Sequence, residues 1–392
     1  MLDALPGFTG VNMPLLSILR LIFTILSLLI LGAAIYMLWE WYDGDLIRQA
    51  DGDLVRVRQD WLLWTALAVL AFSFLGKFLL APLLARPDHG DPSKPERRDG
   101  TTITGGSGAS LYVEQSGPAN APVLVLTHGW AMDSTIWYYT RRALEQHFRI
   151  IVWDLAGLGK SKPARADAIG LTENALDLTS VIELAGGKRV ILVGHSIGGM
   201  TIQTLARDNP EFFRSRVSGA VLVDTTYTNP LKTMILSGLA QAIRWPIIEP
   251  VMRLVILLQP LAWLSAWQSY LSGMSHLANQ FGFGKYVTRS QLEHTTLLAT
   301  RNPPGNISRG NLAMIRWDAT GALAKSGVPV LLIAGDMDIV TKPEASAQIA
   351  AMTPGARVET VEGVNHMGFL EKSSDYVALI TRFAQDHAPA AI

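Results

Sequence analysis

The feature that most restricts how this chain folds is the sequence Gly-His-Ser-Ile-Gly at residues 194–198. It matches the G-x-S-x-G pattern, in which a serine stands on a sharp turn between a strand and a helix. The flanks agree, because residues 189–193 are typical of a short buried strand and residues 197–208 of a helix. Glycines leave room for a strained backbone, so the turn raises the Ser196 hydroxyl out of a sheet. The other small or polar members of the turn are Gly194, His195 and Gly198.

A serine hydroxyl is a weak nucleophile that needs a base, and the base needs an orienting acid. Two downstream segments offer these groups. A buried-strand pattern at residues 328–333 runs into Gly-Asp-Met-Asp, which ends at Asp338, and the strand pattern at residues 356–361 precedes a loop that contains His366. Because the carboxyl ends of parallel strands meet at one edge of a sheet, we expect these side chains to converge on Ser196.

Residues from about 105 to 388 resemble the α/β-hydrolase superfamily, in its capped lipase- and esterase-like branch. The resemblance rests on five short sequences, which are His-Gly-Trp at 128–130, Asp-Leu-Ala-Gly-Leu-Gly-Lys-Ser at 154–161, Gly-His-Ser-Ile-Gly-Gly at 194–199, Gly-Asp-Met-Asp at 335–338 and Asn-His-Met-Gly at 365–368. The serine, aspartate, histidine order along the chain is also the order of this superfamily.

This resemblance implies a catalytic triad of Ser196, Asp338 and His366, in which the second aspartate of Gly-Asp-Met-Asp is the acid. It also implies an oxyanion hole formed by the backbone N–H groups of Trp130 and Ile197, because the family places an H-G-x turn after its third strand. We expect His128, the first residue of that turn, to bond locally rather than to transfer protons.

The same resemblance implies the division of the chain. Strands and helices alternate from about residue 109 to residue 224, which predicts a mainly parallel, doubly wound α/β sheet. We expect the α/β-hydrolase core at residues 109–226 and 317–388. Relatives carry a helical cap over the active site between these two parts, which places the cap at residues 227–316.

The N-terminal part predicts a transmembrane helical hairpin, with helices at about residues 14–40 and 61–84. We expect residues 1–85 to form a membrane anchor and residues 86–108, which are rich in Pro, Gly and charge, to form a linker. Lys77 is the one charge of the second helix and is expected to extend towards lipid headgroups. An amphipathic second helix lying in the interface is the alternative.

Two spans put the N-terminus and the catalytic domain on one face of the membrane. Lysine and arginine gather after the second helix, which favours the cytoplasmic face for the catalytic domain.

Composition excludes several other classes. Lys and Arg number 33 and Asp and Glu also number 33, with no long basic block, so we expect no nucleic-acid partner. The chain has no cysteine, no H-E-x-x-H pattern and no dinucleotide fingerprint, so we expect no disulfide, no metal and no cofactor. The sequence does not determine the oligomeric state.

The expected cap is apolar, since residues 234–271 carry only three charges among many aliphatic and aromatic residues. This pattern favours a membrane-anchored serine hydrolase that cleaves the carboxylic ester of a lipophilic, lipid-like substrate, with the bilayer and this substrate as partners. The alternative is that the apolar residues serve only to bury the cap against the core. Two functional alternatives stay open. The same triad would also serve a thioester, an amide, a carbon–carbon bond or a perhydrolase reaction, and the domain could be a non-catalytic binding or scaffold module.

Overall fold

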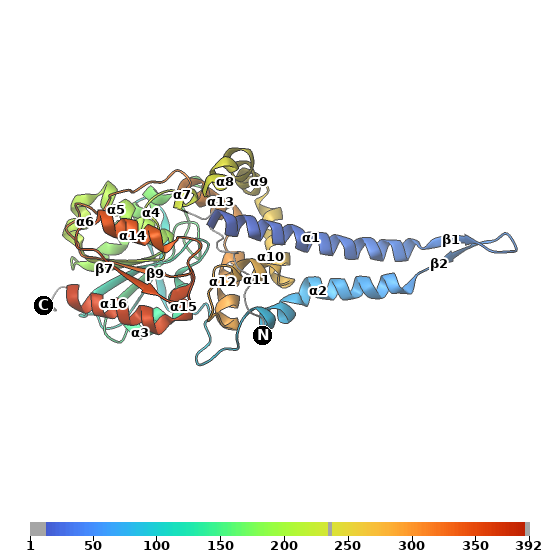
Figure 1. Cartoon of the computed structure of the whole chain (residues 1–392), viewed down its shortest axis with the longest axis horizontal. Coiled ribbons are helices and arrows are strands. Elements are labelled where there is room, and N and C mark those ends of the chain that lie inside the picture. Colours follow the sequence, from blue (N-terminus) through green and yellow to red (C-terminus); the bar gives the residue numbers. More distant parts are fainter. Residues whose placement is uncertain (1–12, 234–236, 389–392) are drawn as a thin grey trace.

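The computed structural model describes residues 13–233 and 237–388. The first twelve residues of the expected anchor and residues 234–236 of the expected cap lie outside this range. Three parts follow one another in space: a sheet domain, a group of short helices and a projecting pair of long helices (Figure 1).

The sheet domain contains one eight-stranded sheet with the order β10-β9-β8-β7-β5-β6-β4-β3. The neighbours from β10 to β6 are parallel, whereas β4 runs antiparallel to both β6 and β3. This arrangement confirms the mainly parallel, doubly wound sheet predicted from the sequence. The strands are β3 (Gly100–Thr104), β4 (Ser110–Ser116), β5 (Val123–Thr127), β6 (Arg149–Trp153), β7 (Val190–His195), β8 (Val217–Val223), β9 (Val330–Gly335) and β10 (Arg357–Val361).

Helices cover both faces of the sheet, which explains why its central strands are continuous apolar runs. Along β5, Val123 and Val125 pack into the core on one face, and Leu124 and Leu126 into the core on the other. Figure 1 shows one face beneath α4 (Leu171–Glu183), α5 (Ile197–Asp208), α6 (Pro210–Arg216) and α14 (Pro343–Met352). The opposite face carries η1 (Ser134–Trp137), α3 (Tyr138–Leu144), α15 (Gly368–Glu371) and α16 (Ser373–His387).

The segment between β8 and β9 contains the group of short helices, which we call the cap. Figure 1 places it between the sheet domain and the long helices. It consists of α7 (Pro230–Thr233), α8 (Ser237–Ala242), the short π-helix Arg244–Ile248, α9 (Glu249–Leu257), α10 (Gln259–Leu271), α11 (Met274–Gln280), α12 (Arg289–Arg301) and α13 (Pro304–Met314). Helices α9 and α10 meet at an angle of 99°, at a break just before Pro260.

The two long helices are α1 (Met13–Asp43) and α2 (Asp60–Leu84), and they pack against each other. Both are long and apolar enough to cross a membrane, by their length and composition. A hairpin of β1 (Asp45–Arg48) and β2 (Leu54–Val57) joins them at the end far from the sheet domain (Figure 1).

The ends of α1 and α2 nearest the sheet domain pack closely on the cap. The hydroxyls of Ser27 and Ser272 lie 2.6 Å apart, and a methyl group on Gly76 would stand 2.5 Å from the Ser272 carbonyl oxygen. Lys77 does not extend towards headgroups as expected. It forms an ion pair of 3.0 Å with Glu293 of α12, because the cap brings this carboxylate to the side of α2.

The segment expected as a linker also differs. Its last part forms β3 on the sheet edge, and Arg97 pairs with Asp133 at 2.8 Å and with Asp154 at 3.0 Å. Arg98 forms a further ion pair with Glu145 at 2.6 Å. These charges resemble linker residues in the sequence because Asp133, Glu145 and Asp154 lie 35 or more positions away along the chain.

Candidate active site

Ser196 stands on a strained turn between β7 and α5, with φ of +54° and ψ of −117°. Such a turn requires small neighbours. A methyl group on Gly194 would lie 2.4 Å from the carbonyl carbon of Gly198, and one on Gly198 would lie 2.3 Å from the Thr127 carbonyl oxygen. The Ser196 N–H donates to the Val223 carbonyl at 2.9 Å, so the adjacent strand β8 fixes the turn.

His366 and Asp338 meet at the edge of the sheet where the turn of Ser196 lies. His366 Nδ1 is 3.0 Å from Asp338 Oδ2, and both side chains are buried. The other carboxylate oxygen accepts the backbone N–H groups of Val340 at 2.6 Å and Thr341 at 2.9 Å. The Thr341 hydroxyl also donates to Oδ2 at 2.8 Å. With these donors Asp338 is held as an acceptor for an N–H on His366 Nδ1.

This tautomer leaves His366 Nε2 as the basic nitrogen. Nε2 is buried and has no hydrogen-bond partner among the residues that the structure describes. The structure brings His366 and Asp338 into contact. It places the turn of Ser196, which follows β7, at the same edge of the sheet as the loops that follow β9 and β10.

Asp336, the other aspartate of the Gly-Asp-Met-Asp sequence, has a different role. It accepts the N–H of Gly363 at 2.6 Å and so closes the turn after β10. This geometry favours Asp338 as the acid.

Asn365 is a positioning residue. It begins the Asn-His-Met-Gly sequence at 365–368, but the sequence alone assigned it no role. Its side-chain oxygen accepts the N–H groups of Ile339 at 3.0 Å and His366 at 2.8 Å. Its amide donates to the carbonyls of Phe281 at 3.1 Å and Phe283 at 3.3 Å, in the loop after α11. One side chain therefore ties the loop of the acid, the backbone of the histidine and the cap together.

His195 contacts both the backbone and the ring of His366. Its Nε2–H donates to the His366 carbonyl at 3.0 Å, and the two ring centroids lie 4.8 Å apart. Burial and the neighbouring His366 ring lower the pKa of His195 well below its usual range, so it stays neutral.

A second buried carboxyl group lies beside the acid. Burial and the charge of Asp338 raise the pKa of Asp224 well above its usual range, which keeps Asp224 protonated. It accepts the Gly335 N–H at 2.8 Å and lies 3.3 Å from the Tyr376 hydroxyl. Of these two carboxyl groups, Asp338 alone contacts His366. Asp224 instead bonds the backbone of Gly335 at the end of β9.

The turn after β5 holds Trp130, one of the two expected oxyanion donors. Its indole N–H donates to the Ile307 carbonyl of α13 at 3.1 Å. The ring lies against Gly310, where a methyl group would stand 1.9 Å from Trp130 Cζ2. Ile197, the other expected donor, is the first residue of α5, where backbone N–H groups are free of intrahelical bonds.

His128 bonds within its own turn, as expected. Its Nδ1 lies 2.7 Å from the Gly129 carbonyl oxygen, and its Nε2 accepts the Leu155 N–H at 3.0 Å. Burial lowers the pKa of His128, in keeping with a neutral ring that has both nitrogens occupied.

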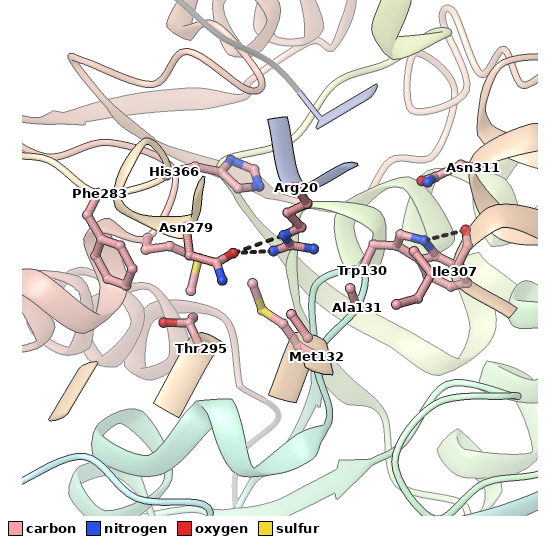
Figure 2. A pocket seen from close by; sticks show the side chains of 13 residues that line it. Arg20, Trp130, Ala131, Met132, Asn279, Phe283, Thr295, Ile307, Asn311 and His366 are labelled. Carbon is pink, nitrogen blue, oxygen red and sulfur yellow. Dashed lines mark hydrogen bonds between the residues drawn. The ribbon is translucent and has the colours of Figure 1, made fainter. Parts of the chain in front are cut away.

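A small pocket, partly open to solvent, lies against His366. Its lining comes from the turn after β5, from the cap and, unexpectedly, from α1 through Arg20 (Figure 2). The lining residues are Arg20, Trp130, Ala131, Met132, Asn279, Gly282, Phe283, Thr295, Ala299, Ile307, Asn311, His366 and Met367. The sequence analysis treated Arg20 only as part of an anchor. A lone charge in an apolar segment was the available signal.

Over residues 13–233 and 237–388, no group of three or more His, Asp or Glu side chains has the arrangement of a metal site.

Comparison with known proteins places this architecture in a family. A family model described as the alpha/beta hydrolase fold matches residues 122–373. The chain therefore belongs to the α/β-hydrolase fold family. It is 29% identical over 290 residues to a pimeloyl-[acyl-carrier protein] methyl ester esterase of Nitrosospira multiformis, a match that covers 70% of this chain and 98% of that protein. The protein of the same name from Yersinia pseudotuberculosis is 25% identical, with 67% of this chain and 93% of that protein covered.

Solved structures share the fold. An esterase from Exiguobacterium antarcticum aligns with a TM-score of 0.60 at 22% identity, covering 73% of this chain and 100% of that one. A bromoperoxidase from Bacillus anthracis aligns with a TM-score of 0.58 at 18% identity, covering 73% of this chain and 100% of that one. At these low identities the two structures show only that the fold is shared. The reaction has to be inferred from the residues of the site.

Proposed function

We propose that this member of the α/β-hydrolase fold family is a membrane-anchored serine esterase that cleaves the carboxylic ester of a lipophilic substrate. The observation that carries the proposal is the 3.0 Å contact between His366 Nδ1 and Asp338 Oδ2, at the sheet edge where Ser196 occupies its strained turn. The names of the relatives, which are esterases, support an ester as the bond.

The proposed reaction uses these groups in sequence. Ser196 Oγ attacks the ester carbonyl carbon while its proton passes to His366 Nε2, and Asp338 stabilises the imidazolium that forms. The backbone N–H groups of Trp130 and Ile197 bind the oxyanion. Breakdown expels the alcohol, which takes the proton from His366 and leaves an acyl-enzyme. Water, deprotonated by His366, then releases the carboxylic acid and restores Ser196.

A lipophilic substrate and a membrane setting are supported by exposed apolar side chains. On α1 and α2 the exposed fractions include 64% for Trp39, 68% for Trp64 and 69% for Phe78. The cap continues this surface with large apolar residues that are also exposed, namely Leu239, Trp245, Ile247, Leu254, Leu257, Leu258, Leu261 and Leu264. Apolar surface of this extent is typical of contact with a membrane or another protein.

The test is covalent labelling of the full-length protein in detergent with a fluorophosphonate, together with hydrolysis of a panel of acyl esters and thioesters. We expect Ser196→Ala to abolish both labelling and hydrolysis while the unfolding temperature stays close to that of the wild type. Ser215→Ala is the matched control, because Ser215 is an exposed serine on α6. Labelling of a folded Ser196→Ala protein would refute the mechanism. A wild type that neither labels nor hydrolyses would favour the scaffold alternative. Turnover of thioesters alone would show that the bond cleaved is a thioester and not an ester.

We further propose that the catalytic domain faces the cytoplasm, on the basis of the Lys and Arg that follow α2. An epitope tag inserted at Gly52, in the turn of the β1–β2 hairpin, would report the opposite face. The orientation is wrong if this tag is reached only from the cytoplasmic side.

A further inference from the structure

We propose that Arg20 of α1 binds an anionic group of the substrate, a carboxylate or a phosphate. The substrate class is then an amphiphilic ester whose acyl or alcohol part carries this negative charge. The inference rests on the proposed function for the identity of the reacting bond, but its binding test does not require turnover.

The first support is the position of Arg20. Its guanidinium lies in the pocket beside His366, between the turn of Trp130 and helix α11 (Figure 2). Asn279 of α11 holds it there, since the Asn279 side-chain oxygen accepts from Nε at 3.0 Å and also from one terminal nitrogen. The guanidinium is thus fixed inside the site rather than spread on a surface.

The second support is the charge of the lining. Arg20 is the one lining residue with a permanent charge. Within residues 13–233 and 237–388 it forms no ion pair, and its hydrogen-bond partner Asn279 is neutral. Lys77, the charge within the apolar part of α2, differs because it pairs with Glu293 at 3.0 Å. A cation enclosed without a counter-ion is costly, and a bound anion would relieve this cost.

The third support is the depth of Arg20 along α1. Residues 21–39 are free of charge and rise about 28 Å as a helix, close to the roughly 30 Å of a hydrocarbon core. Arg20 therefore stands at the end of the apolar run nearest the sheet domain, and Ser27, further along this run, packs against the cap. An amphiphile in the pocket would place its anionic group at Arg20 while its chain remains among the apolar side chains of α1 and the cap.

The planar guanidinium is suited to this role. It offers parallel N–H donors that match the two oxygens of a carboxylate or phosphate. Asn279 engages Nε and one terminal nitrogen, which leaves the other terminal nitrogen for a ligand. The anion would orient the substrate so that its ester lies towards His366 and Ser196.

The experiment measures binding to full-length Ser196→Ala protein in detergent. Two matched pairs of probes are used: the monomethyl ester of a long-chain dicarboxylic acid against the methyl ester of a fatty acid of equal length, and a 1-acylglycerol phosphate against the 1-acylglycerol. The quantity compared is the ratio of the Kd values within each pair. The first pair tests a carboxylate and the second a phosphate, so the two arms identify which anion the site prefers.

We expect a preference for the anionic member of at least one pair, and we expect Arg20→Met to reduce that preference about 10- to 100-fold, as for loss of a charge-assisted hydrogen bond. Arg20→Lys should restore part of it. Asn279→Asp should reduce it with Arg20 still in place, because the new carboxylate would occupy the guanidinium. Arg48→Met, an exposed change in the β1–β2 hairpin, is the matched control and should leave the ratio unchanged.

Equal affinity for both members of both pairs would overturn the inference, as would an anionic preference that survives Arg20→Met and Asn279→Asp. The proposed function fails separately, through absence of labelling and turnover in the wild-type protein. A selective but inactive protein would therefore refute the esterase and keep the anion site.

Discussion

Replacing Asp338 by asparagine tests the orientation of His366, the proposed catalytic base. One carboxylate oxygen accepts the N–H groups of Val340 and Thr341 at 2.6 and 2.9 Å. An asparagine must keep its carbonyl oxygen there, so its NH₂ group would replace Oδ2 and face His366 Nδ1 at about the present 3.0 Å. Two N–H groups cannot face each other, so the ring would move its proton to Nε2. In that tautomer His366 cannot take the proton of Ser196.

We expect kcat for a short, water-soluble ester to fall by about 10⁴, which corresponds to about 5.5 kcal/mol, the loss known for this change in a serine protease triad. Asp336→Asn is the matched control. The asparagine oxygen can still accept the Gly363 N–H, now 2.6 Å away, so kcat should fall by less than about tenfold. Both variants are assayed beside thermal unfolding. A folded Asp338→Asn protein with a tenth of the wild-type kcat, or a larger loss in Asp336→Asn, would refute the assignment.

Two further changes probe the cap. Gly310→Ala would put a methyl group 1.9 Å from Trp130 Cζ2 and displace the turn that carries the Trp130 N–H, so we expect kcat to drop at least about tenfold, and an unchanged kcat in a folded variant would contradict this role. Burial lowers the pKa of His294 to about 4. Its neutral form thus adds stability above the unfolded pKa of about 6.5, and this is lost as pH falls through about 4, so the unfolding temperature of His294→Gln should fall less on acidification than that of the wild type.

The sequence predicted the sheet and the candidate triad because each depends on a local pattern. The run of apolar residues at 190–193 predicts a strand from the local sequence alone, and the structure extends this strand as β7 through His195. Asp338 and His366 each follow such a run. Their meeting required one further rule, that parallel strands present their carboxyl ends at one edge.

The contacts of single charges were not predictable in this way. Lys77 and Glu293 are 216 positions apart, and Arg20 and Asn279 are 259 apart. No periodicity links such partners, because each pairing depends on how the cap helices pack against α1 and α2. For the same reason β3 was not predicted. Its sequence of Gly, Thr and Ile is short, and this segment forms a strand by pairing with β4.

These contacts between distant residues show that α1 and α2 pack on the cap and that α1 also lines the pocket through Arg20. An anchor that only tethers a domain needs no contact with the catalytic pocket, yet α1 supplies Arg20 to its lining and joins the cap through Ser27. The segment between α2 and the sheet domain is also held in place, because Arg97 pairs with two carboxylates of the sheet domain. Helix α1 therefore fixes the pocket at the end of an apolar run that is as long as a bilayer core. A substrate in this pocket would lie beside both the cation of Arg20 and His366, and this combination favours esters that are both lipophilic and negatively charged.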